Sequence, residues 1–224
     1  GQEIRTLVGH TNTVDSVKFT LDGNYLLSAS WDGTIIRWDV VTGQLLHTYE
    51  DHEARVYMLD MMPDGEEFIS ASADGTLIRW NIESGEVLQT YTGHEGEVNG
   101  VNISPDGTQM LSAGGEGIIR LWDVQSGEEI RTYEGHGSSV NYAKFDPNMN
   151  FLISTSWDDT VRMWNIETGE EIRQFVGHTG NTFGIAITSD SEILLTTSSD
   201  TTVRMWQIAS GEELNRFEQH SDWV

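Results

Sequence analysis

Histidine and tryptophan recur along this chain at a fixed spacing of 42 residues. Neither series is interrupted by an insertion or a deletion. The series are His10, His52, His94, His136, His178 and His220, and Trp38, Trp80, Trp122, Trp164 and Trp206. A period of about 20 to 50 residues indicates a repeat architecture, in which each repeat is one supersecondary unit. Near-equivalent units in series favour an extended surface over a single reaction centre.

One repeat, read from His10 to His52, contains four short apolar-rich runs separated by turn residues. The runs cover residues 14–19, 25–30, 34–38 and 44–49, and Gly23, Gly33 and Gly43 lie in the turns between them. This pattern predicts an antiparallel four-stranded meander. A sheet this small cannot bury both faces alone, but radial stacking lets each sheet cover its neighbour.

The sequence therefore predicts an all-β fold, a β-propeller of four-stranded antiparallel blades, with five blades in this chain. We expect one domain over residues 1–224. Its repeats begin near residues 1, 43, 85, 127 and 169, and a partial repeat covers residues 211–224.

Composition excludes several classes of function. The chain has no cysteine, which rules out disulfides, thiolate catalysis and zinc sites built on sulfur. With 36 acidic and 12 basic residues, the net charge is −24, which disfavours nucleic acid as a partner. No apolar run is long enough to span a membrane, and no signal peptide is visible at the N-terminus. We therefore expect a cytoplasmic location and no membrane partner.

Three segments of each repeat carry a family resemblance. Gly9-His10, the segment from Ser28 to Gly33 and Trp38-Asp39 together resemble a WD-repeat, and the resemblance covers the whole chain. The copies vary at two of these places. Gly-His becomes Asp51-His52 and Gln219-His220, and Trp-Asp becomes Trp80-Asn81, Trp164-Asn165 and Trp206-Gln207.

Each repeat also combines a histidine, a Ser or Thr, an acidic residue and a tryptophan at fixed spacing. The sets are His10/Ser28/Asp32/Trp38, His52/Ser70/Asp74/Trp80, His94/Ser112/Glu116/Trp122, His136/Ser154/Asp158/Trp164 and His178/Thr196/Asp200/Trp206. Ser, His and Asp together suggest a hydrolase, but catalysis needs one exposed nucleophile, not five copies. The alternative is a buried chain of hydrogen bonds that makes each blade rigid. The resemblance implies the same, because these positions match the structural tetrad of WD-repeat blades.

No cofactor or metal is expected. The histidines lie one per blade, so they form no cluster at ligand spacing. The segment from Gly114 to Gly117 is glycine-rich, but no Lys-Ser/Thr pair follows it, so it does not match a phosphate-binding loop.

Positions that break the repeat are the candidates for partner binding, since packing does not hold them constant. In WD-repeat proteins, the equivalent positions lie on the narrow top face of the propeller. Aromatic and arginine side chains in a polar surround are typical of interaction hot spots. The candidates for contact with a protein or peptide partner are Trp31, Trp157, Tyr57, Phe183, Arg55, Asp15, Asn99 and Asn141.

We therefore expect a non-catalytic interaction scaffold. Two alternatives are a multi-chain propeller ring that assembles from copies of this chain, and an enzyme with channel-mouth carboxylates, such as a glycoside hydrolase. The absence of long loops disfavours the enzyme. Residues 1–7 match the fourth strand of a repeat, as do residues 211–217, so one fourth strand is surplus. This surplus indicates either a homo-oligomer, most simply of two chains, or a piece of a longer chain.

Overall fold

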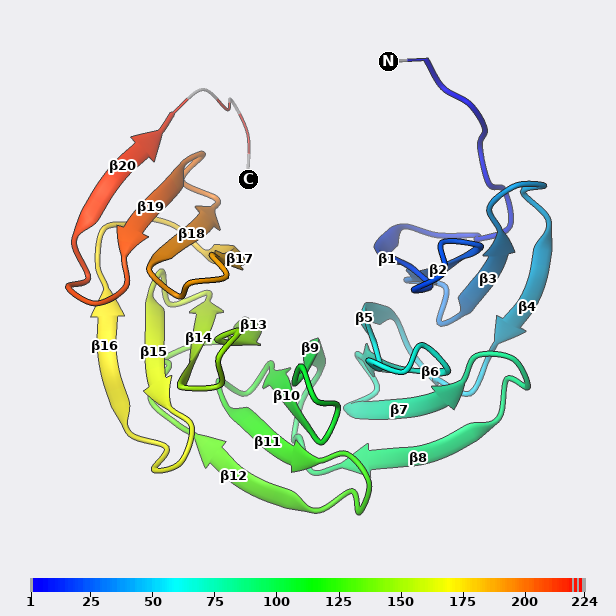
Figure 1. The fold of residues 1–224 in the computed structure, drawn as a ribbon, viewed down its shortest axis with the longest axis horizontal. Helices are drawn as coiled ribbons and strands as arrows, with labels where there is room; N and C mark the ends of the chain where they lie inside the picture. Colours follow the sequence, from blue (N-terminus) through cyan, green and yellow to red (C-terminus); the bar gives the residue numbers. More distant parts are fainter. Residues whose placement is uncertain (1, 219, 221, 223–224) are drawn as a thin grey trace. The chain divides into compact units, whose positions relative to one another are not determined.

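The structure is a computed structural model that describes residues 2–218, 220 and 222. These residues form 20 β-strands in five four-stranded antiparallel sheets, and no helix is assigned among them (Figure 1). The all-β prediction with five four-stranded blades is therefore confirmed. Each sheet is called a blade below, and the blades are numbered in chain order. The partial repeat expected over residues 211–224 lies in part outside the described residues.

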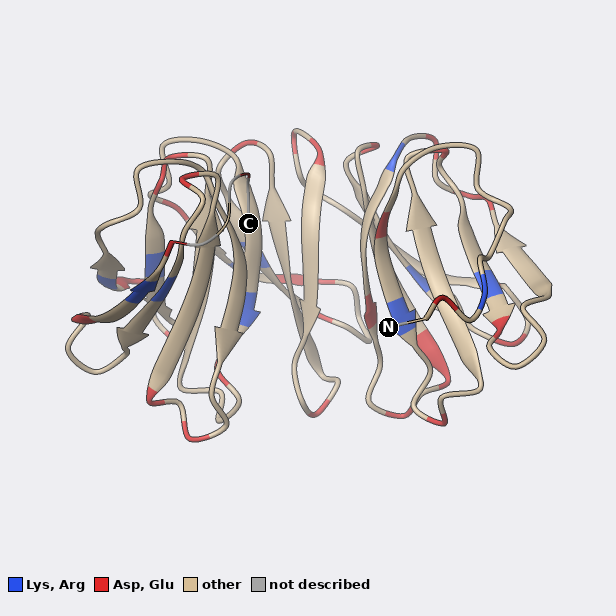
Figure 2. Ribbon diagram, turned by 90° about the horizontal axis from the view of Figure 1, so that it is seen from above, with Lys and Arg blue, Asp and Glu red and all other residues tan. Residues whose placement is uncertain are grey.

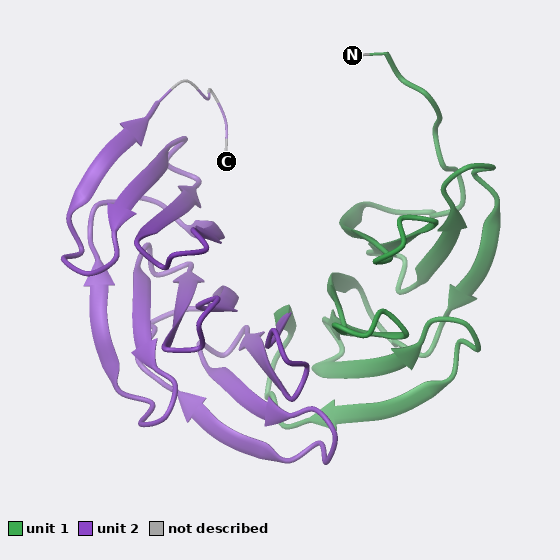
Figure 3. Ribbon diagram, in the orientation of Figure 1, with its two compact units in different colours: residues 1–101 green, residues 102–224 purple. Residues whose placement is uncertain are grey.

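The chain divides into two compact units, Gly1–Val101 and Asn102–Val224 (Figure 3). The division falls inside the first strand of blade 3. Each unit is described by itself, and the single domain expected over residues 1–224 stays a prediction.

Unit 1 holds blades 1 and 2. Blade 1 consists of β1 (Val14–Phe19), β2 (Tyr25–Ser30), β3 (Ile35–Asp39) and β4 (Leu45–Tyr49). Blade 2 consists of β5 (Val56–Met61), β6 (Glu67–Ser72), β7 (Thr76–Asn81) and β8 (Val87–Thr92). Blade 3 begins with β9 (Val98–Ile103), which crosses the division.

Unit 2 holds the remaining strands. Blade 3 continues with β10 (Gln109–Gly114), β11 (Ile119–Asp123) and β12 (Glu129–Tyr133). Blade 4 consists of β13 (Val140–Phe145), β14 (Phe151–Ser156), β15 (Val161–Asn165) and β16 (Glu171–Phe175). Blade 5 consists of β17 (Thr182–Ile187), β18 (Ile193–Ser198), β19 (Val203–Gln207) and β20 (Glu213–Phe217).

The observed strands follow the predicted runs closely. In blade 1 the first two strands have the predicted bounds, and the third begins at Ile35 instead of Thr34. Thr34 lies in the preceding turn, and its backbone N–H and its hydroxyl both donate to the carboxylate of Asp32. The sequence pattern could not show this bond, since Thr34 is β-branched and suits a strand equally well.

Apolar clusters join neighbouring blades within each unit. In unit 1, Leu27 and Ile35 of blade 1 belong to the same buried cluster as Val56 and Leu59 of blade 2. The hydroxyl of Tyr49 donates to the carbonyl of Ile82 across this boundary at 2.7 Å. Unit 2 repeats the arrangement, since Leu111 and Ile119 of blade 3 cluster with Val140 and Ala143 of blade 4. The sheet face that carries these second- and third-strand residues therefore packs against the first strand of the next blade.

Acidic residues are concentrated in the loops. In Figure 2 many of the loops at both ends of the strands are coloured for Asp and Glu, whereas Lys and Arg colour mostly strands. Across the described residues there is no helix long and apolar enough to cross a membrane.

Candidate functional site

The tetrad residues form a chain of hydrogen bonds in four of the blades. The histidine Nδ1 lies 2.7–2.9 Å from an aspartate oxygen, in the pairs His10–Asp32, His52–Asp74, His136–Asp158 and His178–Asp200. The histidine Nε2 lies 2.7–2.8 Å from the hydroxyl oxygen of Ser28, Ser70, Ser154 or Thr196. The indole N–H of Trp38, Trp80, Trp164 or Trp206 donates to the same hydroxyl oxygen at 2.8 Å.

One assignment of protons satisfies every member of this chain. A neutral histidine donates from Nδ1 to the carboxylate and accepts the hydroxyl proton on Nε2, which leaves the hydroxyl oxygen to accept the indole N–H. Burial lowers the pKa of His136 and His178, although the neighbouring aspartates act in the opposite direction. Both rings are therefore neutral at pH 7, as the bond chain requires.

A threonine two residues after each of these aspartates is a fifth member that the sequence analysis missed. The hydroxyl of Thr34, Thr76, Thr160 or Thr202 donates to the aspartate at 2.6–2.7 Å. Burial alone would raise the pKa of these aspartates. The hydrogen bonds from threonine, histidine and the backbone have the larger, opposite effect. The pKa of each therefore lies well below its usual range, in Asp32, Asp74, Asp158 and Asp200. The sequence did contain a signal for this threonine, because it recurs two residues after the aspartate in four of the repeats.

Blade 3 differs at the acidic position. The indole of Trp122 donates to Ser112 at 2.8 Å, as in the other blades. Glu116 replaces the aspartate, and its carboxylate lies 3.6 Å from the guanidinium of Arg120. Ile118 stands where the other blades have the threonine. The turn of blade 3 therefore lacks the threonine hydroxyl that helps to fix the aspartate elsewhere.

The tetrad hydroxyls are inaccessible. Ser70, Ser112, Ser154 and Thr196 are fully buried and Ser28 is nearly so. The oxygen of each hydroxyl accepts a hydrogen bond from the indole N–H. A nucleophilic hydroxyl needs an oxygen lone pair for the attack, and it needs an open route for the substrate. In the described part of the chain, no group of three or more His, Asp or Glu side chains is placed to hold a metal.

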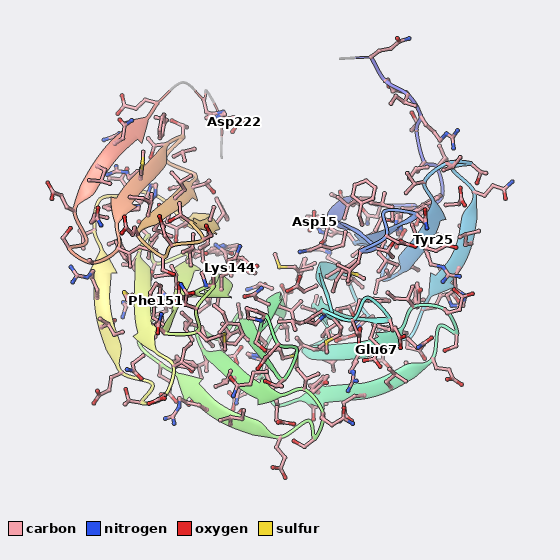
Figure 4. All side chains as sticks on the ribbon, viewed as in Figure 1. Asp15, Tyr25, Glu67, Lys144, Phe151 and Asp222 are labelled. Carbon is pink, nitrogen blue, oxygen red and sulfur yellow. The ribbon has the colours of Figure 1, made fainter. Side chains whose placement is uncertain are left out.

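Four of the predicted binding residues of unit 1 come together at one end of the blades. The indole N–H of Trp31 donates to Asp15 on β1 (Asp15 is labelled in Figure 4), and the guanidinium of Arg55 lies 4.5 Å above the indole ring. The hydroxyl of Tyr57 donates to Glu97 at 2.8 Å. Burial raises the pKa of Tyr57, and Glu97 adds to the effect. These five residues are called the unit 1 patch.

The sequence analysis named neither the Trp31–Arg55 stack nor Glu97 as a binding residue. Asp15, Arg55 and Glu97 are exposed, while Trp31 and Tyr57 are half-buried. Asn99, also predicted as a binding residue, lies half-buried in β9. A half-buried aromatic held by charged neighbours presents one ring edge to solvent in a fixed orientation.

The predicted residues of unit 2 surround the end of β14. Trp157 follows this strand and is 54% exposed. The backbone N–H of Trp157 donates to the carbonyl of Ser139, and the amide of Asn141 donates to the carbonyl of Thr182 at 2.6 Å. Phe183 is half-buried beside Thr182. Asn141, Trp157 and Phe183 are called the unit 2 patch.

A surface hollow of about 470 Å³ lies elsewhere in unit 1. It is lined by the turns of blades 1 and 2, including Leu21, Tyr25, Asp64 and Glu83. It contains none of the predicted binding residues. Its aspartates, Asp22 and Asp64, accept hydrogen bonds within their own turns.

Comparison with known proteins identifies the repeat. The sequence model of the family described as "WD domain, G-beta repeat" matches residues 1–39, 43–81, 85–123, 127–165 and 169–207. Five consecutive matches at the 42-residue spacing cover most of the chain.

Three relatives with curated names share short stretches with this chain. A chromatin assembly factor 1 subunit from Gallus gallus is 45% identical over 53 residues, which is 24% of this chain and 9% of the relative. Nuclear distribution protein PAC1-2 of Uncinocarpus reesii is 48% identical over 63 residues, 25% of this chain and 14% of the relative. Small ribosomal subunit protein RACK1 of Saccharomyces cerevisiae is 48% identical over 44 residues, 20% of this chain and 14% of the relative. These matches span only a small part of each relative.

Proposed function

The chain belongs to the WD-repeat family, and we propose that it is a non-catalytic protein-interaction scaffold. In each unit its partners bind at one end of the blades, the end that carries Trp31 in unit 1 and Trp157 in unit 2. This end of a blade is called its top face, and it comprises the turn between the second and third strands together with the loop that precedes the first strand. The unit 1 patch and the unit 2 patch both belong to these loops and strand ends.

The exposed indole of Trp157 carries this proposal. A tryptophan that is 54% exposed is a costly surface residue, since burying an aromatic ring is strongly favourable. The equivalent positions of the other blades are Trp31, Ala73, Gly115 and Ser199, so blade packing does not demand a large side chain there. Exposed aromatics of this kind are typical anchors of protein interfaces.

The unit 1 patch supplies a second anchor. Arg55 and Asp15 hold Trp31 from two sides, so its ring is oriented before a partner arrives. An oriented side chain loses less conformational entropy on binding than a free one. Arginine and tryptophan are among the side chains most enriched in interface hot spots.

The charge of the chain favours a protein partner over nucleic acid. The net charge is −24, and acidic residues occupy many of the loops (Figure 2). Phosphate backbones are repelled by such a surface, whereas a partner with basic side chains is attracted. We infer a protein or peptide with basic residues around an apolar centre.

Two of the relatives carry names of components of larger assemblies, one of a chromatin assembly factor and the other of the small ribosomal subunit. Those names support a scaffold role for this chain. The buried tetrad hydroxyls support the absence of catalysis, because a reactive serine must be reachable by its substrate.

Site-specific photo-crosslinking tests the proposal. A benzophenone amino acid is placed at Trp157, at Trp31 or at Ile172, and each protein is irradiated in an extract of the source cells. Ile172 on β16 is the matched control, since it is 47% exposed and lies outside both patches. We expect discrete adducts from positions 157 and 31 and none from position 172. Identical adducts from all three positions would refute a specific top-face site.

A further inference from the structure

Blade 1 exposes an apolar face that its counterparts bury. Val14 is 44% exposed, whereas Val56, Val98, Val140 and Thr182, at the same position of the other repeats, are all at 0%. Val17 is 57% exposed, whereas its counterparts Leu59 and Ala143 are buried. Both belong to β1, the first strand of blade 1. The sequence of this strand is therefore that of a covered surface, although Val14 and Val17 are exposed.

Blade 5 exposes the complementary face. Phe217 is 44% exposed, whereas the aromatic residues at the same position, Tyr49, Tyr91, Tyr133 and Phe175, are at 0–2%. Leu195 and Val203 of this blade are half-buried. Their counterparts in all other blades are fully buried, namely Leu27, Ile69, Leu111 and Ile153, and Ile35, Leu77, Ile119 and Val161.

These two faces are the two halves of an interface that the chain already builds. In unit 1, Leu27 and Ile35 of blade 1 pack in one cluster with Val56 and Leu59 of blade 2. In unit 2, Ile153 and Val161 of blade 4 cluster with residues of blade 5, including Ile185. The exposed face of blade 5 corresponds to the faces that blades 1 and 4 present to the blade that follows them. The exposed face of blade 1 corresponds to the faces that blades 2 and 5 present to the blade that precedes them.

We propose that the exposed face of blade 1 binds the exposed face of blade 5 of a second copy of this chain. The contact is head-to-tail, so it uses two different faces and leaves each copy with one of each kind. Val14 and Val17 of one copy then cover Leu195, Val203 and Phe217 of the other. The new interface continues, between chains, the contact that joins neighbouring blades within each unit.

The N-terminal segment marks the position that the second copy would take. The guanidinium of Arg5 donates to the carbonyl of Val41 at 2.7 Å, and Arg173 makes the equivalent bond to Ala209 at 2.9 Å. Arg173 belongs to β16, the fourth strand of the blade that precedes blade 5. Residues 2–7 therefore lie on blade 1 as the fourth strand of a preceding blade does, although no strand is assigned to them. Figure 1 shows this dark-blue segment reaching the hairpin between β3 and β4.

Residues 2–7 and the β20 of the second copy would compete for this position. β20 is paired along its length with β19, from Val203–Phe217 to Trp206–Glu213. Residues 2–7 have no such ladder, and Arg5 contributes a bond at the protein surface, which is worth little. We therefore expect β20 of the second copy to displace residues 2–7, and removal of residues 1–7 to strengthen association.

Complementary variants test the contact by light scattering over a range of protein concentrations. The parent chain is expected to reach at least twice the 25.1 kDa of one chain. Val17→Glu and Phe217→Glu, one on each face, should each remain at 25.1 kDa. Ile172→Glu is the control, because Ile172 is equally exposed but lies on neither face. Circular dichroism spectra that match the spectrum of the parent chain show that the variants are folded.

Mixing the two variants provides the decisive measurement. Val17→Glu retains an intact blade 5 and Phe217→Glu retains an intact blade 1, so the mixture should form a two-chain species through one intact contact. Association should also increase with ionic strength, because salt screens the repulsion between chains of charge −24. A parent chain of 25.1 kDa at every concentration and salt level would overturn the proposal. So would a mixture that stays monomeric, or a loss of association on removing residues 1–7.

Discussion

Thr201 occupies a turn position that suits glycine, and replacing it should stabilise the protein. The residue after each tetrad acid has a positive φ, and blades 1–3 use Gly33, Gly75 and Gly117 with φ of 85–90°. Blades 4 and 5 place Asp159 and Thr201 there, with φ of 67° and 69°. A β-branched residue in this region is unusual, since its side chain crowds the backbone. Thr201→Gly should therefore relieve strain in blade 5.

The magnitude follows from two opposing effects. The left-handed conformation costs a residue with a Cβ about 1–2 kcal/mol, and less for Asp, whose side chain bonds locally. Glycine has more conformational freedom than threonine in the unfolded chain, so ordering it on folding costs about 0.5–1 kcal/mol more. The balance for Thr201→Gly is a gain of about 0.5–1 kcal/mol in the free energy of unfolding. Asp159→Gly should gain less, close to zero.

Urea denaturation measures this difference directly, because the midpoint shifts while the slope stays constant if only folded-state strain changes. Thr179→Gly is the matched control, since Thr179 is an exposed loop threonine that is not among the positive-φ residues. It should lose about 0.5–1 kcal/mol by the entropy effect alone. The reasoning is refuted if Thr201→Gly is as destabilising as Thr179→Gly, or if Asp159→Gly gains more than Thr201→Gly.

Three further predictions concern the tetrads. Asp158→Ala should lower the free energy of unfolding by about 1–3 kcal/mol, because the buried side chain of His136 loses the acceptor of its Nδ1 proton. A fluorophosphonate probe should leave Ser28, Ser70, Ser112 and Ser154 unlabelled, and mass-spectrometric detection of an adduct on any of them would contradict the structural role. Stability should also fall as the pH drops from 7 to 5, because burial lowers the pKa of His136 and His178 in the folded chain while unfolded histidine titrates at about 6.5. Below about pH 4 the aspartates add to the loss, since unfolded carboxyls take up protons before the folded ones, and an unfolding midpoint that stays constant from pH 7 to pH 3 would contradict both effects.

The repeat period predicted most of the fold. It identified four strands per repeat, and β1 and β2 have the predicted bounds. It also led to the tetrad prediction, because the Ser or Thr and the Trp recur at fixed positions in all five copies. Periodicity works here because equivalent residues have equivalent neighbours inside the blade. It failed at Thr34, whose role depends on a bond within a turn and not on its place in a strand.

The sequence could not show which residues at the same repeat position differ in their exposure to solvent. Val14 and Val56 are the same residue at the same repeat position, yet one is 44% exposed and the other is buried. The difference arises from what lies against the strand, which a period in the sequence does not record. The same holds for Phe217 and Phe175. Exposure of an otherwise buried position is therefore the information that the structure adds.

The tetrad connects blade stability with the proposed binding face. Asp158 is held by His136 and Thr160, and Trp157 directly precedes it in the same turn. The orientation of the exposed indole therefore depends on buried bonds beneath it. Asp158→Ala should weaken both folding and partner binding, whereas Trp157→Ala should weaken binding alone. In the proposed scaffold, the buried bonds would fix the turn and the variable residue on the turn would contact the partner.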